Sequence, residues 1–442
     1  MKIHKIVAGL TFLTLLALLP SLGMAQISSV ANAVVPTEYS GGKQDNIYVF
    51  CGQKGETKAS LTATSPDGQP ASFQWQKYNA SSASFDLFLN DQSGGSTSTI
   101  SNLSDGAYRV NITGTSGLTT YTAWVFNNYI ETSSEITNSD CKSFTLKGTF
   151  DSPTFAYIDL TNGQAKQLNK AIQVKWTSGA TTVSSVLTPQ VFEPPTKDTD
   201  YTLTVSDRFN CTSESVVRYI SIVTKASFTY VLEDQTKSHP TKREAPLSVV
   251  FTNTSENGDP GKYQWFIFRD LGEIKKESDA NPGAVIDSIM EKIYSDSPIY
   301  VFERPGKYKV KLVSQKKSDF TTCFDTVYID NIIDIDTSFV EAPNFFTPNG
   351  DEANQNFTIR FFSMKTVKIS IFNRWGKIVH VWESNDVEGF GPTLASDPKS
   401  IWDGKVGGKM AVPGVYYYVV EGTGRDDKKR HKTGFVHLFR GQ

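Results

Sequence analysis

Short runs of alternating apolar and polar residues fill most of this 442-residue chain, and Gly, Asn, Asp and Pro residues separate the runs. Val367, Ile369 and Ile371, for example, alternate with Lys368 and Ser370. A period of two gives a strand one apolar and one polar face, which is typical of antiparallel sheets with one face in water. We therefore predict an all-β protein. Because the chain is too long for one hydrophobic core, we expect several β-sandwich domains in tandem.

Three parts of the chain repeat one arrangement: a strand with Trp, a later strand with Tyr, and then a Cys. The residues are Trp75, Tyr108 and Cys141 in the first copy, Trp176, Tyr201 and Cys211 in the second, and Trp265, Tyr308 and Cys323 in the third. We expect each Trp in the core between two sheets and each Tyr early in a strand whose alternate residues point inward. This layout resembles tandem immunoglobulin-like and PKD-like modules.

The third copy resembles a PKD domain most closely. Pro246–Ser255 matches the second strand of that family, and Tyr300–Gly306 matches its turn into the Tyr strand. The segment Trp265–Asp270 departs from the turn that is usual there. In the insertion that follows, Ala284–Ile293 has apolar residues at helical spacing and predicts the only short helix of the chain, with an ordered loop as the alternative.

Five motifs follow one another in the last hundred residues: Phe346–Asp351, Ile371–Gly376, Trp402–Lys405, Pro413–Tyr418 and Gly434–Arg440. In this order and at these spacings they resemble the gliding-motility-associated C-terminal domain of Bacteroidetes, also called the type B sorting domain of the type IX secretion system. The resemblance implies motif positions at Thr347, Pro348, Asn349, Gly350, Asp351, Asn373, Arg374, Trp375, Gly376, Trp402, Asp403, Gly404, Pro413, Gly414 and Tyr416.

The resemblance implies where the protein goes. A folded C-terminal domain would be recognised by the type IX secretion translocon of the outer membrane after passage through the periplasm, and the protein would reach the cell surface or the extracellular space. We predict a signal peptide at residues 1–25, an immunoglobulin/PKD-like domain at 26–146, an immunoglobulin-like domain at 147–225, a PKD-like domain at 226–335 and the β-sandwich sorting domain at 338–442.

The N-terminus agrees with export. Lys2 and Lys5 precede the apolar run Ile6–Leu19, and Gly23–Ala25 supplies the small residues at which a signal peptidase cleaves. The alternative is an uncleaved anchor, but the run is shorter than the roughly 20 residues of a bilayer span, and Pro20 ends it. We expect no integral membrane span in the mature chain.

The sequence also predicts a central strand within the C-terminal domain and a hinge in front of it. Val415–Val420 is apolar on both faces, so this strand should be central and covered on both sides; left exposed, it would favour aggregation. Asp334–Ser338 is typical of a hinge before the last domain.

The charge distribution argues against nucleic acid as a partner. Residues 338–442 contain 14 Lys and Arg against 11 Asp and Glu, whereas residues 26–337 contain 28 against 35. A nucleic-acid-binding protein would present a clustered and strongly basic face. The basic run Lys428–Lys432 adjoins Asp426 and Asp427 and is better explained as a solvated hairpin tip.

The chain has four cysteines. In an exported protein this number permits two disulfides with three connectivities. Cys51 and Cys141 enclose the first predicted domain, so their pairing is plausible, whereas Cys211 and Cys323 fall in separate domains and their mutual pairing is doubtful. No Cys-x-x-Cys spacing indicates a structural zinc site.

No motif predicts an enzyme, and we predict no catalytic residue. A catalytic triad in the body would need His239, and no nucleophile elbow or Gly-rich loop surrounds it. Composition alone leaves a carboxylate pair for glycoside hydrolysis open, because Asp and Glu are plentiful. An enzyme with an unrecognised site is therefore kept as an alternative.

Two ligand sites can be weighed against structural explanations. Asn349–Asn356 places oxygen side chains on alternate residues as calcium loops do, but Glu352 and Gln355 depart from the Gly and Asp common in the resembled family. We favour an Asx-type turn and predict no metal or other cofactor. Tyr121, Trp124 and Phe126 could form an exposed carbohydrate-binding face, but aromatic residues that fill cores are the simpler explanation.

These observations favour an exported structural or adhesive surface protein whose body binds a protein or a glycan. An accessory component of the type IX secretion or gliding apparatus is the alternative from another class. Sandwich domains place recognition in their loops, so the sequence leaves the ligand open.

Overall fold

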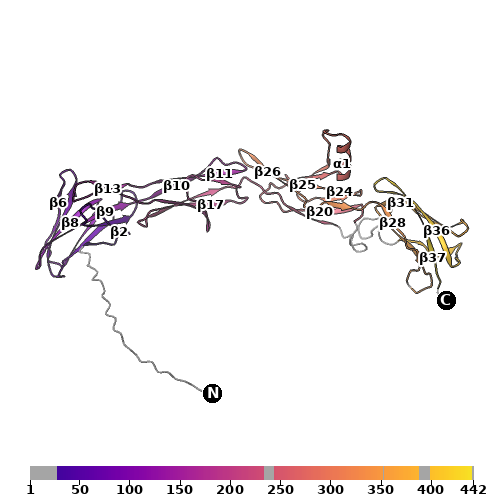
Figure 1. Ribbon diagram of the computed structural model, residues 1–442, viewed down its shortest axis with the longest axis horizontal. Coiled ribbons are helices and arrows are strands. Elements are labelled where there is room, and N and C mark those ends of the chain that lie inside the picture. The colour runs from indigo at the N-terminus through magenta and orange to yellow at the C-terminus, as the bar shows by residue number, and fades with distance from the viewer. Residues whose placement is uncertain (1–26, 233–242, 352, 388–398, 441–442) are drawn as a thin grey trace, which may run out of the picture. The chain divides into compact units, whose positions relative to one another are not determined.

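The computed structural model describes residues 27–232, 243–351, 353–387 and 399–440 (Figure 1). The predicted signal peptide, His239 and Glu352 lie outside these residues. Strands account for 56% of the described residues and helix for 3%, which confirms the all-β class. The chain divides into two compact units. The first comprises Met1–Thr137, Thr145–Gln190 and Asp200–Arg218, and the second comprises Asn138–Phe144, Val191–Thr199 and Tyr219–Gln442.

The first sandwich has a six-stranded and a three-stranded sheet. Its strands are β1 (Ile27–Ser28), β2 (Ala33–Pro36), β3 (Asn46–Cys51), β4 (Ala59–Thr64), β5 (Ser72–Asn79), β6 (Ser84–Asp91), β7 (Thr97–Leu103), β8 (Gly106–Gly114) and β9 (Gly117–Asn128). The sheet orders are β1-β4-β7 and β2-β3-β9-β8-β5-β6. Between the sheets lies a core that contains Phe73, Trp75 and Tyr108.

The opposite face of the six-stranded sheet is covered as well. Trp124 and Phe126 are buried there against Phe155 and Tyr157, which come from a later part of the first unit. The Trp124 Nε1–H donates a hydrogen bond to the Tyr39 hydroxyl at 2.7 Å, and Tyr121 packs against the other core. These aromatic residues therefore fill cores, and the alternative of an exposed carbohydrate-binding face is wrong.

The second sandwich has strands β10 (Glu131–Thr137), β11 (Ser143–Asp151), β12 (Phe155–Ile158), β13 (Ala165–Leu168), β14 (Gln173–Ser178), β15 (Thr181–Ser184), β16 (Gln190–Phe192), β17 (Thr199–Ser206) and β18 (Thr212–Tyr219). Its sheets have the orders β10-β11-β16, β12-β13 and β15-β14-β17-β18. Trp176 on β14 is buried, and its Nε1–H donates to the Leu187 carbonyl at 3.2 Å.

The third sandwich has strands β19 (Phe228–Leu232), β20 (Leu247–Asn253), β21 (Gln264–Phe268), β22 (Ile289–Tyr294), β23 (Ile299–Phe302), β24 (Gly306–Tyr308), β25 (Val310–Lys317), β26 (Thr322–Tyr328) and β27 (Ile333–Ile335). The sheets are β19-β20-β23, β22-β21-β25-β26 and β24-β27. Trp265 is buried in its core, and its Nε1–H donates to the Ser295 carbonyl at 2.8 Å.

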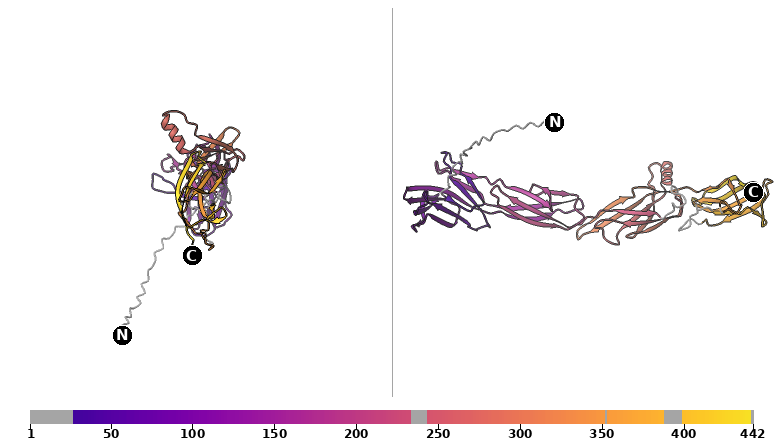
Figure 2. Two further views of the ribbon diagram at one scale, coloured as in Figure 1. Left: turned by 90° about the vertical axis from the view of Figure 1, so that its right-hand side faces the viewer. Right: turned by 90° about the horizontal axis from the view of Figure 1, so that it is seen from below.

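The helix predicted at Ala284–Ile293 is wrong. Ile289 and Ile293 belong to β22, where Ile293 pairs with Trp265 of β21, because residues four apart share a face in a strand as well as in a helix. The helix of the third sandwich, α1 (Leu271–Ala280), lies just upstream and projects from the sheets (Figures 1 and 2). Asp270 caps it, since its side chain accepts a hydrogen bond from the Glu273 N–H at 2.9 Å.

The fourth sandwich has strands β28 (Phe339–Glu341), β29 (Phe345–Phe346), β30 (Phe357–Phe362), β31 (Met364–Phe372), β32 (Ile378–Ser384), β33 (Lys399–Trp402), β34 (Lys405–Val406), β35 (Lys409–Met410), β36 (Gly414–Gly424) and β37 (Lys429–Leu438). The sheets are β28-β30-β33, β34-β35 and β29-β37-β36-β31-β32. Only Lys428 of the basic run lies in the turn between β36 and β37, and residues 429–432 belong to β37. The Arg430 guanidinium donates to the Asp426 carboxylate and the Ser338 carbonyl, so the prediction of a solvated hairpin tip is confirmed only in part.

Strand β36 is central, as predicted, but it is covered on one face only. Tyr416, Tyr418 and Val420 lie in the core between the two larger sheets, whereas Tyr417 is 49% exposed. The prediction that both faces are covered is wrong because the three-stranded sheet packs on one side of the five-stranded sheet and no described residue covers the other.

The predicted hinge at Asp334–Ser338 is part of the folded structure. Ile335 on β27 lies in the core of the third sandwich. The Asp336 N–H donates to the Arg243 carbonyl at 2.9 Å, and the buried Ser338 hydroxyl donates to Asp426 at 3.1 Å. The alternation of Asp334, Ile335 and Asp336 is therefore that of a strand with one buried position.

The predicted pairing of Cys51 with Cys141 is wrong. In the first unit Cys51, at the end of β3, forms a disulfide with Cys211, which precedes β18. In the second unit Cys141, between β10 and β11, forms a disulfide with Cys323 on β26. Each bond joins different sandwiches. Cys51 and Cys211 lie in the core that Trp124 and Phe126 of the first sandwich form with Phe155 and Tyr157 of the second.

Candidate functional site

The predicted sorting motifs converge on Trp402 in the fourth sandwich. The Trp402 ring is buried, with its centroid 5.5 Å from that of Phe346 and 4.8 Å from that of Tyr416. Its Nε1–H donates to the Lys405 carbonyl at 2.8 Å. Trp402 therefore connects the first, third and fourth motifs through one buried side chain.

Gly404 permits the close approach of these motifs. Its φ of +76° lies in the left-handed region. A Cβ atom at this position would lie 3.2 Å from Pro348 and 3.3 Å from both Leu438 and Phe346. The neighbouring Asp403 carboxylate accepts a hydrogen bond from the Lys405 N–H at 3.0 Å and closes the turn.

The second motif is a tight turn between β31 and β32. The Asn373 side-chain oxygen accepts hydrogen bonds from the N–H groups of Trp375 and Lys377, both at 3.0 Å. Gly376 has a φ of +75°, which closes the turn. The Trp375 side chain itself is 83% exposed.

The fourth motif forms a tyrosine corner at the start of β36. The Tyr416 hydroxyl donates to the Val412 carbonyl at 2.8 Å, and Gly414 has a φ of +147°. The same bond from Tyr to the fourth preceding residue recurs at Tyr108 and Tyr308, each with Gly two residues earlier. The repeated Gly-x-Tyr pattern is therefore a structural device of three sandwiches, and the second copy has Thr199 in the Gly position.

The second and fourth motifs share a hollow on the surface. Its lining residues are Asn373, Arg374, Trp375, Val412, Pro413, Gly414, Val415 and Tyr416. Burial raises the pKa of the Tyr416 hydroxyl, and the positive charges of Arg440 and Arg374 oppose this shift. Two arginines from separate motifs thus lie close to one tyrosine.

The loop Asn349–Asn356 is organised around the Gln355 side chain. The Gln355 Nε2 donates to the side-chain oxygens of Asn349 at 3.0 Å and Asp351 at 2.8 Å and to the Ala353 carbonyl at 3.0 Å. Its Oε1 accepts from the Gly350 N–H at 2.8 Å. Hydrogen bonds from Asn349 and the Ala353 N–H lower the pKa of Asp351. An amide nitrogen thus occupies the point on which the loop oxygens converge.

We expect calcium to leave the melting temperature of the protein unchanged, because the Gln355 amide already satisfies these oxygens. The variant Gln355→Asp should behave differently. A second carboxylate beside Asp351 would repel it without a cation and would complete an oxygen ligand set with one. Thermal unfolding with millimolar calcium or with a chelator measures both effects. A calcium-dependent rise in the melting temperature of the unchanged protein would contradict the assignment.

The sequence interpretation missed a second feature of the fourth sandwich, the exposed side of its five-stranded sheet. Tyr417 on β36 lies directly opposite Phe435 on β37, and both side chains are 49% exposed. The apolar residues on both faces of Val415–Val420 are the sequence signal of this surface, because such a strand either is covered on both sides or exposes one apolar face.

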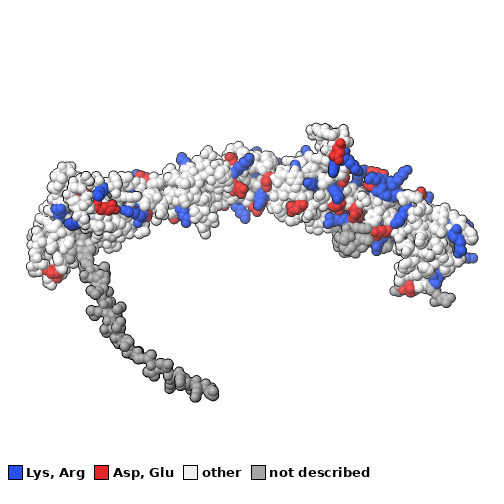
Figure 3. Space-filling view, viewed as in Figure 1, with Lys and Arg blue, Asp and Glu red and all other residues white. Residues whose placement is uncertain are grey.

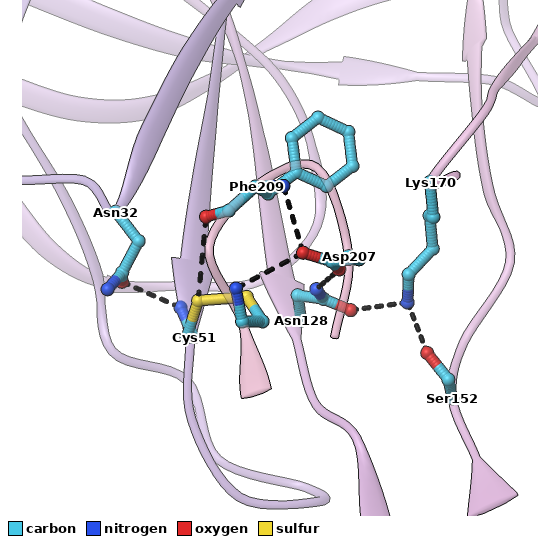
Figure 4. The surroundings of a disulfide bond; sticks show 8 residues. Asn32, Cys51, Asn128, Ser152, Lys170, Asp207 and Phe209 are labelled. Carbon is cyan, nitrogen blue, oxygen red and sulfur yellow. Dashed lines mark hydrogen bonds between the residues drawn. A yellow bond between two sulfur atoms is a disulfide. The ribbon is translucent and has the colours of Figure 1, made fainter. Parts of the chain in front are cut away.

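The junction around Cys51 and Cys211 contains a buried polar network that sequence reasoning did not find (Figure 4). Lys170 is buried, and its ammonium group donates to the side chains of Asn128 and Ser152 and to the Pro153 carbonyl. Asn128 donates to Asp207 at 2.5 Å. Burial lowers the pKa of Lys170, and the negative charge of Asp207 opposes this shift.

In the described parts of the chain, no three His, Cys, Asp or Glu side chains group as metal ligands would. Likewise, none of the helices described there is long and apolar enough to cross a membrane. Lys and Arg side chains are interspersed with Asp and Glu on the face seen in Figure 3.

The fold and the converging motifs define a protein of tandem β-sandwiches that carries a C-terminal sorting module. Residues 340–438 match the family model of the CHU_C Type IX secretion signal domain. This match indicates export through the type IX secretion system to the cell surface or the extracellular space. No curated protein sequence matches the chain.

Several solved structures of tandem sandwich domains are similar in part. A tetra-tandem repeat from the extending region of a large adhesion protein has 12% identity and a TM-score of 0.28, over 87% of this chain and 96% of that one. Eight N-terminal Ig domains of the Down Syndrome Cell Adhesion Molecule have 11% identity and a TM-score of 0.25, over 92% and 55%. An I-band fragment of titin has 11% identity and a TM-score of 0.29, over 66% and 98%. None of these likenesses bears on function.

Proposed function

We propose that this chain is a non-enzymatic surface protein whose body binds a protein or a glycan, and whose fourth sandwich directs it through the type IX translocon. The observation that carries the proposal is the sorting module at 340–438, a folded sandwich whose motifs meet around one buried Trp. A signal of this kind is a folded shape, because its residues are far apart in sequence and adjacent only after folding. We also propose that the four predicted domains correspond to the four sandwiches, with the third PKD-like. Because β10 and β11 pair with each other in the second sandwich, its boundary with the first lies before Glu131 and not at 146.

The disulfides support a structural or adhesive body. Each connects different sandwiches within one unit, with sequence separations of 160 and 182 residues. Covalent bonds of this kind keep neighbouring sandwiches together when a ligand pulls on them, and they are stable in the oxidising surroundings of a cell exterior. A protein that binds a ligand while force pulls on the chain needs such covalent links between its domains.

Deletion of residues 338–442 tests the export function. We expect the truncated protein to accumulate in the periplasm, because the folded signal is removed, while the full chain becomes accessible to protease added to intact cells. Cell fractionation and protease accessibility measure the two pools. A truncated protein that reaches the surface in wild-type amounts would refute the proposal.

Loss of the whole gene tests the binding function. Cells without the protein should attach less well to the surface or partner that they colonise, and should still export other proteins that carry the same signal domain. A block in the export of those other proteins would instead favour a component of the secretion apparatus.

A further inference from the structure

The uncovered side of the five-stranded sheet in the fourth sandwich is apolar across four adjacent strands (β31, β36 and β37 are labelled in Figure 1). Phe435, Tyr417, Phe372 and Ile378 lie directly opposite one another on β37, β36, β31 and β32. They alternate with residues of the core, and Ile378 is 51% exposed. Monomeric proteins rarely expose a continuous apolar surface of this kind without using it.

Aromatic residues extend this row at one end of the sheet. Phe345 on β29 lies opposite His437, whose ring stacks on Phe439 with 5.4 Å between centroids. Phe345 and Phe439 are both exposed. We call the outward side chains of Phe345, Phe372, Ile378, Tyr417, Phe435 and Phe439 the apolar face.

The two borders of the apolar face differ in charge. Towards the turn of β36 and β37, the outward positions become polar, with Lys368 between Glu383 and Glu421. At the other border lie Arg374, the exposed Trp375 and Arg440. Arg374 is exposed, and the Arg440 Nε and one of its terminal nitrogens are buried without a hydrogen-bond partner among the described residues.

We propose that the apolar face is the surface by which the export machinery holds this protein, and that it binds a protein with an apolar surface bordered by carboxylates. The inference rests on the proposed export function. The composition fits, because Trp, Tyr, Phe and Arg dominate the binding energy of protein interfaces and a polar rim surrounds them. The exposed Arg374 at this border can form an ion pair with a carboxylate of the partner.

The test exchanges Tyr417→Ser and Phe435→Ser together in the full-length protein, in cells that carry a type IX secretion system. The control is Leu87→Ser with Leu118→Ser, two exposed apolar residues of the first sandwich. We expect the first variant to reach the surface at least about tenfold less than the control and to accumulate in the periplasm, because interface aromatics of this kind carry most of the binding energy. The purified variant should melt at the wild-type temperature, and Ile378→Ser on the edge strand replaces it if it does not.

The outcomes separate the inference from the function on which it rests. If deletion of residues 338–442 abolishes export and the Tyr417/Phe435 variant is exported normally, the apolar face is not the interface. If the deletion itself is exported, the proposed function fails. A photo-crosslinking amino acid at position 417 should give an adduct with an outer-membrane protein. An adduct only with lipid or with a second copy of this chain would overturn the proposal.

Discussion

Removal of the Cys51–Cys211 disulfide, by the exchanges Cys51→Ser and Cys211→Ser, is expected to lower the free energy of unfolding of the first unit by about 2–4 kcal/mol. The bond closes a loop of 160 residues, and the loop-entropy estimate for such a length is about 5 kcal/mol, which is an upper bound. Without the bond the unfolded chain regains the conformational entropy that the closed loop had removed, and this gain lowers the free energy of unfolding. With a urea dependence of about 2–3 kcal/mol per molar, the midpoint should fall by about 0.7–2 M.

The measurement is urea unfolding of the full-length protein, followed by tryptophan fluorescence, since Trp75, Trp124 and Trp176 are all buried in the first unit. The matched control is Cys141→Ser with Cys323→Ser, which should leave this transition in place and lower the transition of the second unit instead. An unchanged midpoint in the Cys51/Cys211 variant would show that the bond contributes no stability to the unit.

The exchange Asp207→Ala is expected to destabilise the first unit by about 3 kcal/mol. One Asp207 oxygen accepts hydrogen bonds from the N–H groups of Phe209 at 2.9 Å and Cys211 at 3.1 Å, and the other accepts from Asn128. All of these groups are buried, so the exchange leaves three donors without an acceptor. It also removes the negative charge that opposes the cost of burying the Lys170 ammonium group.

Two further variants check this explanation by urea unfolding. Asp207→Asn keeps an oxygen acceptor for the two backbone N–H groups, so its effect should be smaller, about 1–2 kcal/mol. Asp67→Ala also removes a carboxylate with several hydrogen bonds, but an exposed one whose partners can turn to water, and it should change the midpoint least. Equal effects of Asp67→Ala and Asp207→Ala would contradict the role assigned to burial.

Local sequence patterns predicted the strands well where one face of a strand is buried. The alternation at Val367–Ile371 corresponds to β31, and Trp75, Trp176 and Trp265 all lie in cores. The pattern failed at Ala284–Ile293, because a spacing of four is common to helices and strands. It also failed at Val415–Val420, because apolar residues on both faces do not say what covers the second face.

The sequence predicted the turns of the candidate site but not the contacts between its motifs. The turn residues of the sorting motifs were recognisable as Asn, Gly and Pro at fixed positions, and the structure places them in turns. That Trp402 brings Phe346 and Tyr416 together, and that Arg374 lies beside Tyr416, depends on the packing of strands separated by many residues.

The sequence by itself determined the all-β class, the strand periodicity and the export signal, since these depend on neighbours along the chain and on motifs in a fixed order. Only the tertiary structure decided the pairing of Cys51 with Cys211 and of Cys141 with Cys323, the burial of Lys170, and the exposure of Tyr417 and Phe435. The physical reason is that disulfides, buried charges and uncovered faces are set by which surfaces of different sandwiches meet. A periodic pattern within one strand contains no information about that contact.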